Sequence, residues 1–158
     1  NASKGNYYPC YSEPMSQGTR CRQLAEYVVF ESPLNMLCDS PTNYDREEEC
    51  TEFIATIPTV WEQTIAMSGE IGKCITMARR KGDVWYVGSL TNWDARTLTL
   101  DLSFLGTGRW KAEMFHDGVN ANRLASDYQK TVTDIPASRK LTVKMAQGGG
   151  CALKIYKE

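Results

Sequence analysis

Residues 73–102 read KCITMARRKGDVWYVGSLTNWDARTLTLDL, and this stretch decides the fold. Near its end Leu98, Leu100 and Leu102 alternate with threonine or aspartate. A period of two is typical of a strand with one buried face and one wet face. The polar break at residues 81–83 contains a glycine between two charged residues and predicts a tight hairpin. The stretch therefore predicts three consecutive antiparallel strands.

The same pattern continues to the end of the chain. Leu141, Val143 and Met145 alternate with lysine and threonine, and residues 148–150 are glycines that permit a sharp turn before a last strand. About eight strands are typical of an antiparallel β-sandwich. The expected strands are Val60–Met67, Lys73–Arg80, Val84–Leu90, Arg96–Leu102, Arg109–His116, Tyr128–Ile135, Lys140–Ala146 and Cys151–Tyr156.

Helical periodicity replaces this alternation before Pro58, so we place a domain boundary between residues 57 and 58. Ser16 or Thr19 can cap a first helix, and Ser32 with Pro33 should stop it. Its apolar residues share one face and should point to a core: Cys21, Leu24, Ala25, Val28 and Val29.

A helix–strand–helix unit is expected to complete the region before Pro58. The short apolar run Leu34–Cys38 predicts a buried parallel strand that ends at Asp39. Thr42 or Asn43 can cap a second helix that runs on to residue 57. Such a unit is typical of the end of an alternating α/β fold.

Charge and composition exclude several classes of partner. Eighteen basic and nineteen acidic residues leave a net charge of -1, which offers no general attraction to nucleic acid or to an anionic membrane. No run approaches the roughly twenty apolar residues that cross a bilayer. We therefore expect neither nucleic acid nor a membrane as a partner.

The cysteines and the arginine cluster carry little chemistry in this interpretation. The six cysteines are widely spaced without a C-x-x-C pair, so we expect mostly free, buried thiols and no cysteine metal site. The only histidine, His116, is expected to be a solvated turn residue. Arg79, Arg80 and Lys81 are expected to form a solvated charge cluster at a hairpin end.

Two residues are candidate substrate ligands. Asp39 would lie at the C-terminal end of a parallel strand, where ligand groups gather in α/β barrels, although an Asx turn before Pro41 is the more common role of such a residue. Trp93, in a polar loop, could offer a flat face for a sugar ring, although aromatic residues near strands more often belong to a core. Glu47–Glu49 could suggest calcium, but adjacent helical carboxylates point in different directions and suit a helix N-terminus.

Several long sequence segments closely resemble those of glycoside hydrolase family 97. They are residues 14–21 (PMSQGTRC), 27–34 (YVVFESPL), 58–62 (PTVWE), 78–83 (ARRKGD), 85–88 (WYVG) and 98–105 (LTLDLSFL). The resemblance implies an enzyme with an N-terminal β-sandwich, a central (β/α)8 barrel and a C-terminal antiparallel β-domain. It also implies cleavage of α-glucosides with inversion or of α-galactosides with retention, with calcium assisting.

On this map the chain is α+β, an antiparallel β-sandwich of about eight strands preceded by the helix–strand–helix end of a (β/α)8 barrel. Residues 1–57 would be the barrel remnant and residues 58–158 the β-domain. The family's catalytic carboxylates and calcium-binding glutamates precede the stretch that begins near Tyr7. The resemblance therefore implies no catalytic residue, no metal ligand and no cofactor within this chain, and calcium only in the full-length enzyme.

The expected function is that of a non-catalytic C-terminal fragment of an α-glycosidase whose β-domain stabilises the barrel, with the fragment inactive alone. One alternative is a carbohydrate-binding module that uses Trp93, and another is a free-standing hydrolase that pairs Asp39 with Glu13 or Glu31. Expected partners are the rest of the barrel and an oligo- or polysaccharide. Exposed barrel edges predict self-association through residues 7–57. The resemblance implies a periplasmic or cell-surface location in Bacteroides-like bacteria.

Overall fold

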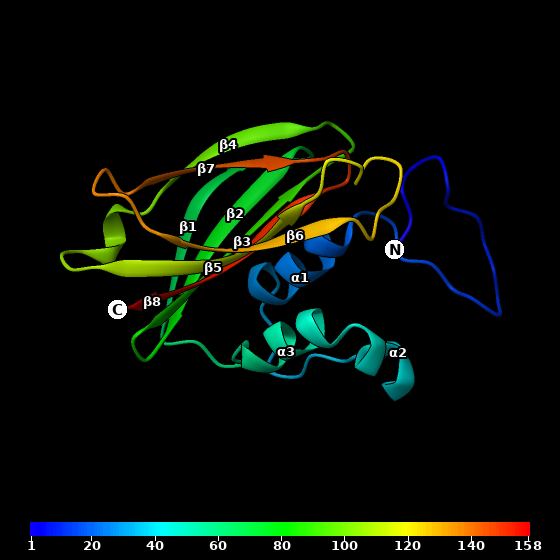
Figure 1. Cartoon of the computed structure of the whole chain (residues 1–158), viewed down its shortest axis with the longest axis horizontal. Helices are drawn as coiled ribbons and strands as arrows, with labels where there is room; N and C mark the ends of the chain where they lie inside the picture. Colours follow the sequence, from blue (N-terminus) through cyan, green and yellow to red (C-terminus); the bar gives the residue numbers. More distant parts are fainter.

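The computed structural model describes residues 1–158 and contains eight strands in two sheets, with three α-helices (Figure 1). A six-stranded sheet has the order β1-β2-β3-β8-β5-β6, and β4 pairs with β7 in a second sheet. The elements are α1 (Arg20–Val29), α2 (Pro41–Arg46), α3 (Glu48–Thr56), β1 (Gln63–Glu70), β2 (Cys74–Lys81), β3 (Val84–Thr91), β4 (Arg96–Asp101), β5 (Trp110–Asp117), β6 (Tyr128–Asp134), β7 (Lys140–Met145) and β8 (Gly150–Lys157), with a short 3-10 turn at Ser103–Leu105.

All strand pairs are antiparallel, and the predicted strands are confirmed with small shifts at their ends. The hairpin between β2 and β3 turns at Gly82, whose φ of 57° suits glycine. The largest shift concerns β1, which begins at Gln63 instead of Val60. Trp61, before β1, packs its ring edge-on against that of Tyr86 in β3, at 5.5 Å between centroids. The chain therefore passes close to β3 before β1 pairs with β2.

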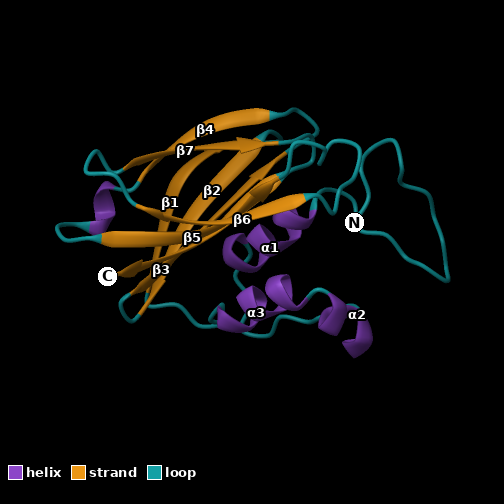
Figure 2. Ribbon diagram, in the orientation of Figure 1, coloured by secondary structure: helices purple, strands orange, loops and turns teal.

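The main core lies between the two sheets. Leu100 of β4, Leu102 directly after it and Val143 of β7 are buried against Val87 and Leu153 of the larger sheet. This is the face that the alternating pattern predicted. Only two strands cover this side, and the helices lie on the opposite side of the larger sheet (Figure 2).

A second core lies under α1, which begins at the predicted cap Thr19, whose hydroxyl accepts a hydrogen bond from the Arg22 amide at 3.1 Å. The helix approaches the sheet closely, because a Cβ at Gly88 would lie 2.8 Å from the carbonyl oxygen of Ala25. α3 adds Phe53, whose ring meets that of Phe115 at 4.7 Å. None of the helices is long and apolar enough to cross a membrane.

The segment between α1 and α3 differs from its prediction. Leu34–Cys38 forms no strand, and Leu34 and Met36 are 75% and 74% exposed. A parallel strand is held by hydrogen bonds to neighbouring strands, and no strand of this chain lies beside the segment. The second helix is divided at Glu47 into α2 and α3, and its cap is Ser40, not Thr42 or Asn43, because Pro41 occupies the first helical position.

Candidate functional site

The joint between α1 and the sandwich is built around Arg79, which is 3% exposed. Its Nε donates to the carbonyl of Val28 at 2.7 Å, and its Nη2 donates to that of Val29 at 3.0 Å. Its Nη1 donates to Glu31 at 3.2 Å and to Thr64 at 3.1 Å. A strand residue thus binds the last carbonyls of the helix, which have no partner inside the helix.

The expectation that Arg79 belongs to a solvated cluster is therefore wrong. Arg80 and Lys81 are at the surface and pair with Glu62, at 3.0 and 3.6 Å. Alternation along β2 separates Arg79 from Arg80, since Arg79 lies on the face that α1 covers. The alternation along β2 was the sequence signal that Arg79 and Arg80 face opposite sides of the sheet. The sequence does not show that α1 covers the side of Arg79 and supplies carbonyl acceptors there.

The other end of α1 meets the sandwich at Asp117, a second residue that the sequence did not single out. Its Oδ2 accepts hydrogen bonds from the amides of Ala146 at 2.8 Å and Gly150 at 3.2 Å. The Thr19 amide donates to the Gly148 carbonyl at 3.0 Å. Burial raises the pKa of Asp117, although hydrogen bonds to the carboxylate oppose that rise. Asp117 therefore holds the glycine-rich turn against the start of the helix.

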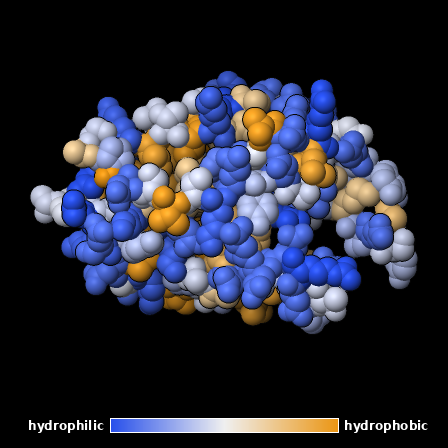
Figure 3. All heavy atoms as spheres, in the orientation of Figure 1, coloured by the Kyte–Doolittle hydropathy of each residue, from blue (hydrophilic) through white to orange (hydrophobic).

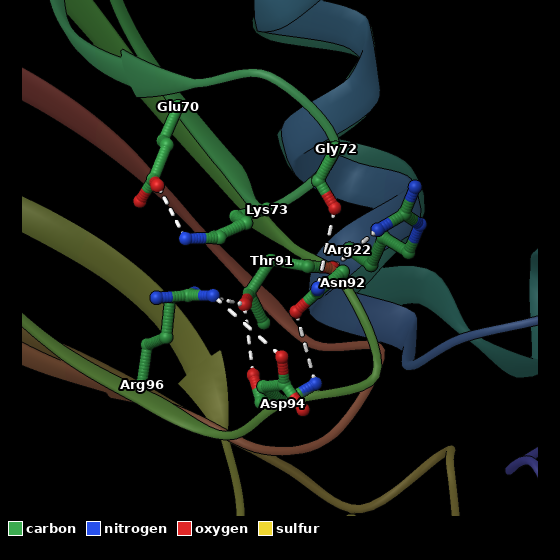
Figure 4. Close-up of polar contacts among 8 residues, drawn as sticks. All are labelled: Arg22, Glu70, Gly72, Lys73, Thr91, Asn92, Asp94 and Arg96. Atoms are coloured by element: carbon green, nitrogen blue, oxygen red, sulfur yellow. Dashed lines mark hydrogen bonds and ion pairs between the residues drawn. The ribbon is translucent and has the colours of Figure 1, made fainter.

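The loop that contains Trp93 follows β3 and is held by its own polar groups (Figure 4). The Asn92 side chain accepts a hydrogen bond from the Asp94 amide at 3.0 Å, and the Thr91 hydroxyl donates to the Asp94 carbonyl at 2.8 Å. Arg96 Nε donates to the Thr91 hydroxyl at 3.0 Å. Arg22 from α1 reaches the Thr91 carbonyl at 2.7 Å, so the loop is also tied to the helix.

Trp93 itself is half-buried and packs on the glycine turn. A Cβ at Gly148 would lie 2.4 Å from the Trp93 ring, which leaves only glycine at that position. The ring is therefore held in place, with part of its surface open to solvent. His116, expected in a solvated turn, is half-buried within β5, with Nδ1 3.3 Å from the Asp117 carbonyl oxygen.

Asp39 lies at the wall of a hollow of about 820 Å³ between the N-terminal loop, α1 and the α2–α3 segment. Its carboxylate accepts hydrogen bonds from Asn43 Nδ2 and from the Ser40 amide, both at 2.7 Å. These two bonds, first that from Asn43, lower the pKa of Asp39. The geometry is that of a turn at a helix start, which is the alternative interpretation of this residue.

The two residues considered as carboxylate partners of Asp39 differ in position. Glu13 lines the same hollow as Asp39, but Glu31 does not and is bound to Arg79. Two other acidic residues of the hollow are engaged by arginines, Glu26 by Arg22 at 3.1 Å and Glu47 by Arg20.

The residues present do not fit a calcium ion. The chain has no group of three or more histidine, cysteine, aspartate or glutamate residues that could hold a metal. Glu47 pairs with Arg20, whereas Glu49 accepts a hydrogen bond from the Tyr128 hydroxyl at 2.8 Å. Glu47, between the two helices, and Glu49, in the first turn of α3, are thus bound by different partners. All six cysteines are free, and Cys21, Cys50 and Cys151 are buried.

Exposed apolar side chains gather in the part of the chain around the hollow. Seven of the thirteen large apolar residues exposed to solvent lie between residues 7 and 37, in the N-terminal loop and after α1. Figure 3 shows the loop standing away from the body of the molecule across a deep notch. The seven residues are Tyr7, Tyr8, Tyr11, Phe30, Leu34, Met36 and Leu37. Large apolar side chains exposed in such number are candidates for an interface with another domain.

Comparisons with known proteins identify the family of the chain. Residues 60–156 match the family model described as glycosyl-hydrolase 97 C-terminal, oligomerisation. The chain is 63% identical over 155 residues to a retaining alpha-galactosidase of Bacteroides thetaiotaomicron, covering 98% of this chain and 23% of the relative. It thus spans less than a quarter of that protein.

Solved structures share the fold. A glycoside hydrolase family 97 enzyme in complex with acarbose, from Pseudoalteromonas sp., superposes with a TM-score of 0.84 and 38% identity, over 89% of this chain and 23% of that one. A β-arabinopyranosidase superposes with a TM-score of 0.75 and 26% identity, over 87% of this chain and 21% of that one. The chain belongs to glycoside hydrolase family 97, and its sandwich is the C-terminal domain of that family.

Proposed function

We propose that the chain is the C-terminal part of an enzyme that cleaves α-galactosides with retention. The observation that carries the proposal is the 63% identity over 155 residues to a retaining alpha-galactosidase. An α-glucosidase is the alternative that the sequence left open. The similarity to the Bacteroides relative favours the galactoside, since it extends over 98% of this chain.

In this proposal the chain supplies no catalytic group and instead supports the barrel. The exposed apolar residues between positions 7 and 37 offer a surface for the remaining barrel elements. Arg79 binds the end of α1, and the glycine turn that Asp117 holds binds the Thr19 amide at its start, so that the helix can transmit the position of the sandwich to the barrel. Calcium, which the family resemblance implies, would bind outside this chain.

Hydrolysis of aryl α-galactosides and aryl α-glucosides tests the proposal, with this chain compared with a longer chain that includes the whole barrel. Only the longer chain should turn over substrate, and the galactoside should be preferred. Calcium chelation should lower the activity of the longer chain. Turnover by the short chain would place catalytic groups within residues 1–158 and return attention to Asp39.

Sugar binding by the Trp93 loop is a second candidate function. The hydrogen bonds around Asn92 and the packing on Gly148 hold the ring before any ligand arrives, which lowers the entropic cost of stacking a sugar on it. Migration of the chain through gels that contain galactomannan or starch tests this. Retardation that Trp93→Ala abolishes would support a binding module, and unchanged migration in every polymer would exclude it.

We also propose that the protein is exported and that copies of it associate. The family description of the C-terminal domain names oligomerisation, and the apolar surface around residues 7–37 should make the isolated fragment self-associate. Export to the periplasm or cell surface follows the family resemblance. Cell fractionation tests the location, and sedimentation of the fragment over a range of concentrations tests its association.

A further inference from the structure

The two sheets leave four strand edges unpaired, and one of them differs from the others. Proteins commonly place charges or a β-bulge on free edges, because an unprotected edge can pair with another chain, and β1 has a bulge but few charges. Residues 63–69 of β1 read QTIAMSG and carry no charge, although this strand is as long as any in the sheet. The other free edges each carry two charged residues: Lys130 and Asp134 in β6, Arg96 and Asp101 in β4, and Lys140 and Lys144 in β7.

The ends of β1 suit contact with a second protein surface. Glu62 is bound by Arg80 at 3.0 Å, and Glu70 is bound by Lys73, so neither carboxylate presents an unbalanced charge. Val60 before the strand is 60% exposed, and Ile71 after it is fully exposed. Apolar residues thus flank an uncharged ladder of backbone donors and acceptors.

The register of β1 shifts between Ala66 and Ser68, which leaves two regular runs, 63–66 and 68–70. With a two-fold axis at this bulge, run 63–66 of each copy would lie beside run 68–70 of the other copy. Both half-ladders then remain regular, and Val60 of one copy lies at the same end as Ile71 of the other. Antiparallel pairing of identical strands about a two-fold axis is self-complementary and closes at a dimer.

We propose that two copies of the protein associate through β1, joining their six-stranded sheets into one continuous sheet. The inference rests on the proposed function, in which the C-terminal domain associates, and names the surface that does so. One strand edge buries less than the area of about 1,200 Å² or more that is typical of stable complexes. The pairing should therefore be weak and concentration-dependent unless other parts of the enzyme add to it.

The test uses the longer chain, in which the barrel covers the apolar segment at residues 7–37. Ala66 is exposed on β1, so Ala66→Lys and Ala66→Glu should each place like charges together at the two-fold axis. Each variant alone should dimerise at least tenfold more weakly in sedimentation velocity runs. An equal mixture of the two should regain the dimer, because the charges are then opposite. Val132→Lys, at an exposed site on β6, is the matched control and should dimerise like the unmodified chain.

A longer chain that remains monomeric at all concentrations would overturn the inference. So would Ala66 variants that dimerise normally, or a Val132 variant that loses as much affinity as they do. Failure of the mixture to regain the dimer would show that the variants act without pairing of β1. Galactosidase activity is measured on the same samples and should not depend on the Ala66 charge. Failure of the proposed function would appear in the galactosidase assay, whereas failure of the β1 interface would appear only in sedimentation.

Discussion

Replacing Arg79 with methionine should detach α1 from the sandwich while keeping the apolar stem of the side chain. The change removes four hydrogen bonds, two of which bind carbonyl groups at the end of the helix. Hydrogen bonds to charged groups contribute about 1.5–3 kcal/mol each, but the cost of burying the guanidinium also disappears. We expect the free energy of unfolding to fall by about 2–4 kcal/mol, or about 30- to 700-fold in the unfolding equilibrium.

The neighbouring arginine provides the control. Arg80→Met removes a surface pair with Glu62 at 3.0 Å, and exposed pairs contribute about 0–1 kcal/mol. Urea unfolding followed by circular dichroism measures both variants, and hydrogen exchange should show faster opening of α1 only for Arg79→Met. The reasoning is refuted if Arg79→Met costs no more than Arg80→Met, because the buried hydrogen bonds would then contribute nothing beyond a surface pair.

Three further changes probe the same regions. Gly88→Ala should destabilise the protein by about 1–3 kcal/mol because the new Cβ would meet the backbone of α1, whereas Gly5→Ala, with open space around it, should be neutral in the same urea assay. Burial raises the pKa of the Asp117 carboxyl, so the folded state binds its proton more tightly than the unfolded state does. The stability that the protonated group contributes at low pH is therefore lost as the pH rises through its folded pKa. Relative to Asp117→Asn, the unmodified chain should therefore lose stability as the pH rises above about pH 4, and a stability difference that does not change with pH would contradict this. Burial raises the pKa of Cys151 to about 12, so native protein at pH 8 should not be alkylated there, while exposed Cys38 is modified; mass spectrometry of the two peptides checks this.

The strands could be predicted because each carries its own pattern. Leu98 and Leu100 turn to the same face wherever the strand lies, and Gly82 marks its hairpin without reference to the rest of the fold. Thr19 could likewise be named, together with Ser16, as a candidate cap from its place before an apolar stripe. These signals are local, and local preferences agree with the final fold here.

The residues between the helices could not be predicted in this way. Leu34–Cys38 has the composition of a buried strand, but a parallel strand exists only beside partners, and this chain places none there. The role of Arg79 depends on α1, about fifty residues before it in the sequence, and that of Asp117 depends on the turn at residues 146–150, about thirty residues after it. Whether Asp39 or Trp93 touches a sugar stays a prediction, since their measured contacts are with neighbouring residues and the glycine turn.

The change of sequence pattern at Pro58 does not coincide with a break in packing. One core cluster joins Leu24 and Phe53, which precede this proline, to Leu90, Phe115 and Ala152, which follow it. Burying a large apolar side chain contributes about 1.5–3 kcal/mol, and total stabilities are only about 5–15 kcal/mol. A sandwich cut at Pro58 would expose this face and lose a large share of its stability. The division at residue 58 therefore separates two kinds of sequence pattern, while α1 and the sandwich pack around one shared core.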